Sequence, residues 1–150
     1  MEHEEYMRQA LELARQAMAE GEVPVGCVIV RDGAVVGRGR NRRETAQTAL
    51  GHAELEAIGE ACRTLGGWRL WQCTLYVTLE PCIMCAGLMH QSRIARCVFG
   101  APDPKAGAVG TLYQVNADER LNHTFEVTPG VLADECSALL KDFFANKRKK

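Results

Sequence analysis

The sequence predicts an α/β fold in which helices cover both faces of a largely parallel sheet. Helical and strand-like segments alternate after an opening β-hairpin, so the later strands need helical crossovers between them. The 150 residues can bury a core, and 47% hydrophobic with 25% charged residues is typical of a globular protein. The chain shows no internal repeat and no linker. We therefore expect one domain spanning residues 1–150.

The elements are predicted from apolar periodicity and from turn residues. Apolar side chains recur every three or four positions in residues 4–20, which indicates an amphipathic helix that Gly21 ends. Two β-branched runs meet at Asp32-Gly33, a strong signal for a β-hairpin. The remaining prediction is a helix at 53–64, a strand at 73–79, a helix at 82–92, a strand at 95–100, a long loop at 101–122, a strand at 124–128 and a helix at about 131–146.

Composition limits the location of the protein. No apolar run approaches the ~20 residues of a membrane span, and the acidic, polar start is unlike a signal peptide. The seven cysteines are odd in number and mostly lie in apolar stretches, which indicates buried free thiols. We expect a cytoplasmic protein without membrane contact. The net charge of −1 neither favours nor excludes nucleic acid, and only the final "KRKK" is locally basic.

Cys82 and Cys85 follow Pro81, which suits the first turn of the predicted helix 82–92. At this spacing both thiols lie on one helical face, and a helix N-terminus favours their thiolate forms. Two such thiolates can bind one zinc ion. The spacing alone also fits a thioredoxin-like redox pair or two core cysteines.

His52 begins the predicted helix 53–64 and is the candidate for a third zinc ligand. One His and two Cys would leave an open fourth position, as in catalytic zinc sites, whereas structural zinc sites are closed by four protein ligands. Glu54 is the candidate proton carrier, since it would lie beside the metal without binding it; the alternative is an exposed helix glutamate. Candidates for a fourth ligand, none with supporting spacing, are Cys62, Cys73, Cys97 and His90.

The stretch His52-Ala53-Glu54, followed after 26 residues by Pro81-Cys82-Ile83-Met84-Cys85, resembles the signature of zinc nucleoside deaminases. Segments such as "EVPVGCVIV", "LYVTLEPCIMCAG" and "FGAPDPKAGAVGTL" extend the likeness over nearly the whole chain to the family of bacterial tRNA-specific adenosine deaminases. The resemblance implies a three-layer α/β/α, cytidine-deaminase-like fold with a five-stranded mixed sheet, in a homodimer. One segment, "ETAQTALGHAE", departs from the Asp-Pro-containing family pattern, so we expect a different loop shape there.

The resemblance also implies a reaction. His52, Cys82 and Cys85 would hold one zinc ion per subunit, while Glu54 shuttles protons during hydrolysis of adenosine to inosine. The substrate would be the wobble position of a tRNA anticodon loop, in an arginine tRNA, where the target base is unpaired. Substrate-binding residues that the resemblance implies are Val25, Asn41, Ala53, Pro81, Asp103 and Lys105.

The C-terminal tail is a further candidate for RNA contact. Phe143 and Phe144 are adjacent in a predicted helix, so one can pack inward while the other faces outward. We expect Phe144, Lys147 and Arg148 to hold the anticodon loop by stacking and by phosphate neutralisation. The alternative is a solvated basic end.

Two other functions stay open on the sequence. The first is a different deaminase, acting on guanine, free cytidine or a cytidylate. The second is a non-catalytic, zinc-stabilised nucleic-acid-binding domain. That second function predicts a zinc ion closed by four protein ligands and a Glu54 that the protein can do without.

Overall fold

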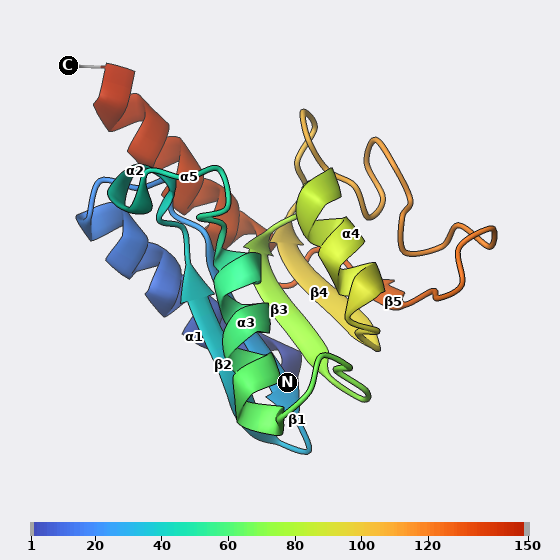
Figure 1. Cartoon of the computed structure of the whole chain (residues 1–150). Coiled ribbons are helices and arrows are strands. Elements are labelled where there is room, and N and C mark those ends of the chain that lie inside the picture. The colour runs from blue at the N-terminus through green and yellow to red at the C-terminus, as the bar shows by residue number, and fades with distance from the viewer. Residues whose placement is uncertain (1, 149–150) are drawn as a thin grey trace.

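The computed structural model describes residues 2–148 and shows a five-stranded mixed sheet between two layers of helices (Figure 1). The expected three-layer α/β fold is therefore confirmed. In chain order the elements are α1 (Glu2–Ala19), β1 (Gly26–Arg31), β2 (Ala34–Arg40), α2 (Arg43–Ala46), α3 (Ala53–Leu65), β3 (Thr74–Leu79), α4 (Ile83–Gln91), β4 (Arg96–Ala101), β5 (Glu126–Thr128) and α5 (Ala133–Arg148).

The strand order across the sheet is β2-β1-β3-β4-β5. The expected parallel pairing is confirmed for β3 with β4 and for β4 with β5. The exception is β1, which pairs antiparallel with both β2 and β3. The chain leaves β2, passes through α3 and enters β3 on the far side of β1, so β1 lies between two strands that run opposite to it.

The strands divide their side chains between two cores. In β1, Cys27 and Ile29 pack with α3 and α4, whereas Val28 and Val30 pack with α1 and α5. This is the two-residue alternation of a strand that is buried on both faces. As a result α3 and α4 share one face of the sheet (Figure 1), and their first residues lie at the same end of it.

Helix α3 lies unusually close to the backbone of β2. A Cβ atom added at Gly39 would lie 2.2 Å from the carbonyl oxygen of Ala53, and one added at Gly37 would lie 2.3 Å from that of Ala57. Both alanines are fully buried. This backbone-to-backbone contact fixes where α3 begins, and therefore where His52 and Glu54 lie.

Two details differ from the sequence prediction. Helix α2 was not expected, because four residues are too few to show a helical period. Helix α4 begins at Ile83 with Cys82 as its N-cap, so Pro81 lies just outside the helix and not in its first turn. The long loop between β4 and β5 is confirmed, with only an isolated bridge between Val109 and Gln114.

The structure can be compared with two further expectations, that the cysteines are buried free thiols and that no segment spans a membrane. All seven cysteines are free thiols, and five of them are buried. Within residues 2–148, no helix combines the length and the apolar character that a membrane span requires.

Candidate metal centre and substrate pocket

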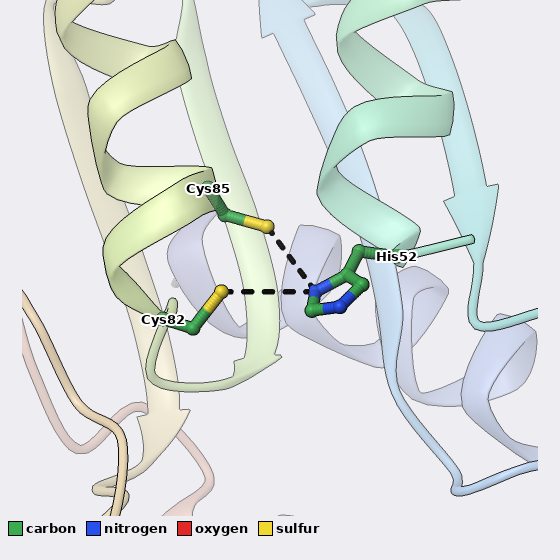
Figure 2. A group of neighbouring side chains, drawn as sticks. All are labelled: His52, Cys82 and Cys85. Carbon is green, nitrogen blue, oxygen red and sulfur yellow. Dashed lines mark hydrogen bonds between the residues drawn. The ribbon is translucent and has the colours of Figure 1, made fainter. Parts of the chain in front are cut away.

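Three candidate ligands meet where α3 and α4 begin. His52 is the N-cap of α3, Cys82 is the N-cap of α4, and Cys85 lies in the first turn of α4. Figure 2 shows the His52 ring pointing at both sulfurs, with its Nδ1 atom 3.7 Å from Sγ of Cys82 and 3.4 Å from Sγ of Cys85. The structure thus brings together residues that are 30 positions apart in the chain.

The spacing of these donors fits a tetrahedral zinc ion. Zn–S bonds of about 2.3 Å and Zn–N bonds of about 2.0–2.1 Å, at tetrahedral angles, place nitrogen and sulfur about 3.5 Å apart. The two N–S separations lie on either side of that value. Within residues 2–148 only these three donors, all within 4.8 Å of one another, form such a group. The site therefore has one coordination position to spare.

The two thiols are not equivalent. Hydrogen bonds from the Cys85 thiol and from the backbone N–H groups of Cys85 and Met84 lower the pKa of Cys82 to about 5. The same thiol contact, together with burial, raises the pKa of Cys85. The start of α4 therefore favours one thiolate even before a metal binds, and a cation would favour the second.

Glu54 lies beside this group in the first turn of α3 and is only 4% exposed. Burial is the main reason that its pKa is raised to about 7. A carboxyl group with such a pKa can take up and release a proton near neutral pH, as general acid–base catalysis requires. The structure thus does not place Glu54 on an exposed helix face.

A pocket of about 180 Å³ opens at the metal group. Of the predicted substrate-binding residues, Val25, Asn41, Ala53 and Asp103 line it. Pro81 does not line it; this residue is buried, and its carbonyl oxygen accepts a hydrogen bond from the Ala108 N–H. The other lining residues are Val23, Arg43, His52, Glu54, Leu79, Glu80, Cys82 and Ala106.

Asn41 is held in place by two hydrogen bonds at the pocket wall. Its Nδ2 atom donates to the Val23 carbonyl at 3.2 Å, and its Oδ1 atom accepts from the Arg43 N–H at 3.3 Å. The second amide hydrogen and the second lone pair are left over. A bound base could use either of them without disturbing the wall.

Glu80 organises the loop on the opposite side of the pocket, and our sequence reasoning missed it. The residue is only 2% exposed. Its carboxylate accepts hydrogen bonds from the backbone N–H groups of Asp103, Val109 and Thr111 at 3.0–3.2 Å, and from the Thr111 hydroxyl. Gly107 leaves room for it, because a Cβ there would lie 2.3 Å from the Glu80 carboxyl carbon. The only sequence signal was an acidic residue between an apolar strand and Pro81.

A second, larger hollow of about 720 Å³ adjoins the pocket between α5 and residues 101–105. Asp103, Lys105 and Phe144 line it, together with Lys141. We call it the α5 groove. It shares Val23, Leu79 and Asp103 with the smaller pocket, so the two form one continuous depression.

The tail residues separate in the structure. Phe143 is buried and Phe144 is 44% exposed in the α5 groove. Lys147 does not line the α5 groove; its Nζ lies 5.3 Å from the centre of the Phe143 ring, on the side of α5 that faces the end of α1. Arg148 ends α5, and its side chain lies outside the described part of the structure.

The chain is similar in sequence to known proteins. Residues 1–101 match the family model of the cytidine and deoxycytidylate deaminase zinc-binding region. The tRNA-specific adenosine deaminase of Bacillus subtilis (strain 168) is 51% identical over 145 residues, which cover 97% of this chain and 90% of that protein.

Solved structures agree with the family model. A structure from work on A-to-I editing by tRNA:A34 deaminases superposes with a TM-score of 0.87 at 40% identity, covering 91% of this chain and 99% of that one. A guanine deaminase from Nitrosomonas europaea gives a TM-score of 0.80 at 26% identity, covering 95% and 84%. The chain therefore belongs to the cytidine and deoxycytidylate deaminase family, in the branch of the tRNA-specific adenosine deaminases.

Proposed function

We propose that this protein hydrolyses adenosine to inosine at the wobble position of a tRNA anticodon loop, in an arginine tRNA. The observation that carries the proposal is one pocket, lined by His52, Cys82 and the buried Glu54, at which Cys85 completes a three-donor metal group at tetrahedral spacing. The names of the relatives support adenosine in tRNA as the substrate.

The pocket residues divide the chemical work. One zinc ion per subunit, held by His52, Cys82 and Cys85, would make water a nucleophile near neutral pH. Glu54 would carry one proton of the water to the purine ring nitrogen and the other to the amine, which leaves as ammonia while the water oxygen becomes the carbonyl oxygen of inosine. Asn41 holds the edge of the base with its remaining amide hydrogen or lone pair.

The α5 groove supports a substrate larger than a nucleoside. It adjoins the pocket and offers an exposed aromatic ring, Phe144, beside Lys105 and Lys141. Unpaired loop nucleotides are commonly bound by stacking on aromatic side chains together with neutralisation of their phosphates. We propose that Asp103, Lys105 and Phe144 contact nucleotides next to the target, while Lys147 and Arg148 add charge at the end of α5.

The two other functions that the sequence leaves open have less support. A closed structural zinc site would need a fourth protein ligand, and within residues 2–148 the metal group has three. A different deaminase activity is favoured by one observation, the likeness to a guanine deaminase. Guanine is therefore the alternative substrate to test.

The proposal is tested by incubating the zinc-loaded protein with total bacterial tRNA and reading adenosine-to-inosine changes by sequencing. We expect conversion at the wobble position of an arginine tRNA, and none when Glu54→Ala replaces the wild type. Guanine and cytidine are assayed in parallel for released ammonia. Turnover of guanine without any inosine in tRNA would overturn the proposal.

We also propose a cytoplasmic homodimer, as the family resemblance implies. Large apolar side chains, among them Trp68, Trp71 and Tyr113, are at least half exposed and could supply a contact surface. Light scattering during gel filtration would show twice the chain mass of 16.5 kDa. A monomer at micromolar concentration would contradict the homodimer without affecting the proposed reaction.

A further inference from the structure

Three arginines surround Asn41, and their surroundings differ. Two nitrogens of Arg40 each lie 2.9 Å from a carboxylate oxygen of Glu20. Nε of Arg42 lies 3.0 Å from a carboxylate oxygen of Glu56. Arg43 forms no salt bridge with an acidic side chain among residues 2–148. It is exposed and lines the 180 Å³ pocket. Its guanidinium is therefore a cation at the pocket that no side chain of the described chain neutralises.

The backbone that carries Arg43 is firmly held. The Arg43 N–H donates to Asn41 Oδ1, and the Arg42 N–H donates to the Gly51 carbonyl at 2.8 Å, closing the loop 42–51. On the other side of Arg43, the buried Glu22 carboxylate accepts the N–H groups of Glu44 and Thr45 at 3.1 and 2.6 Å. The guanidinium thus extends from a fixed base at the pocket.

A cation at the pocket would favour RNA as its ligand, because the rest of the pocket is acidic. Its other charged lining residues are Glu54, Glu80 and Asp103, which are all acidic, and the whole chain has a formal net charge of −1. The net charge therefore gives no general attraction for a phosphate chain, so phosphates must be held by local cations. Lys105 and Lys141 supply them in the adjoining α5 groove, and Arg43 supplies one at the pocket itself. Within the described residues that line the pocket, Arg43 is the one side chain that is always positive.

We propose that Arg43 binds a backbone phosphate directly beside the target nucleotide, and so sets the register of the RNA over the pocket. A guanidinium can hold two phosphate oxygens at once, which fixes orientation as well as distance. This inference deepens the proposed function and rests on it. It concerns substrate binding, so the variant should chiefly change KM and leave kcat close to that of the wild type.

The test uses an anticodon stem-loop RNA and three variants. For Arg43→Ala we expect KM to rise about tenfold, as for loss of one charge-assisted contact. The slope of log KM against log salt should fall by about 0.7, the value for one single-strand phosphate. Arg43→Lys should keep the wild-type salt slope, because the charge remains. Arg63→Ala is the matched control: Arg63 is exposed in the last turn of α3, about 16 Å along the helix from His52.

A second arm identifies the partner. RNAs carrying one uncharged methylphosphonate linkage, on either side of the target adenosine, are assayed with wild type and Arg43→Ala. We expect one of these linkages to weaken the wild type and to have no further effect on the variant. Equal losses in both enzymes for each linkage, or a KM and salt slope for Arg43→Ala like those of the wild type, would overturn this inference alone. A wild type that deaminates no RNA would overturn the proposed function, and this inference with it.

Discussion

Three glutamates, Glu22, Glu54 and Glu80, are almost completely buried, and their surroundings give them different chemistry. Burial disfavours the carboxylate in each case. For Glu22 and Glu80, hydrogen bonds from a threonine hydroxyl and from backbone N–H groups outweigh burial and lower the pKa. Glu54 has fewer such donors, so burial prevails and raises its pKa to about 7. Two of these carboxyls are thus structural anions, and the third can carry a proton.

This contrast gives the first prediction. Glu54→Ala should lower kcat for RNA deamination by at least 10²–10⁴-fold, the usual value of a general acid–base group, because the proton carrier is lost. Zinc content, measured by mass spectrometry, should stay near one ion per chain, since the three donors are unchanged. Glu4→Ala, on the exposed face of α1, serves as the control with normal turnover. Normal turnover by Glu54→Ala would refute the assigned role.

At the scale of elements, α2 is held by a residue from outside its own segment. Its first turn is anchored by Glu22, whose carboxylate also accepts the Thr45 hydroxyl. Glu22→Gln removes the charge and one acceptor, so we expect about 1–2 kcal/mol lower stability near neutral pH. Urea unfolding monitored by circular dichroism measures this difference.

The pH dependence of that difference follows from the direction of the pKa shift. The folded-state pKa of Glu22 lies below its ordinary value of 4.5, so its stabilising effect is complete above 4.5 and is lost as pH falls through the folded-state pKa. The gap between wild type and Glu22→Gln should therefore be widest at about pH 7 and narrower at about pH 4. A gap that stays constant or widens in acid would contradict this account.

The loop on the opposite side of the pocket, residues 102–111, depends on a missing side chain. Gly107→Ala would put a Cβ 2.3–2.5 Å from the Glu80 carboxyl atoms, so the loop or Glu80 must move. We expect lower thermal stability and faster trypsin cleavage after Lys105, because the backbone hydrogen bonds to Glu80 are lost. Gly87→Ala, in α4, is the control: apart from the neighbouring residues and the backbone of its own helix, no atom lies within 4 Å of the new Cβ, so it should be neutral or stabilising. Equal cleavage rates for the two variants would argue against a loop held by Glu80.

For the molecule as a whole, the last residues of the chain contribute a large share of the positive charge. Deleting residues 145–150 removes four basic side chains and takes the formal net charge from −1 to −5. We expect KM for tRNA to rise and its salt dependence to flatten, because phosphate contacts are lost. The melting temperature should change little, since Phe143 and the apolar residues before it stay in place. Unchanged KM at several salt concentrations would show that the tail is a solvated end.

The sequence predicted those features that are set by residues close together in the chain, and it missed those that depend on contacts between distant residues. Helices α1 and α3, the hairpin and the donors His52, Cys82 and Cys85 carry local signals of period, turn and spacing. Helix α2 carries none, because it is only one turn long, and the residue that anchors it, Glu22, lies about 20 positions away in the sequence. The antiparallel pairing of β1 with β3 results from a crossover, which no local pattern encodes. The sequence does not distinguish Arg43 from its neighbours Arg40 and Arg42, because only the structure shows that those two form salt bridges with glutamates.

The close contact between β2 and α3 bears on how such an enzyme can diversify. Any side chain at Gly37 or Gly39 would push α3 outward and carry His52 and Glu54 away from the two cysteines on α4. Descendants of this chain can therefore change substrate by varying the loop 42–51 and the end of α5, which we propose contact the RNA, but they cannot alter those glycines without losing the metal centre itself. Laboratory evolution aimed at a new substrate would do best to spare both positions and randomise the loops.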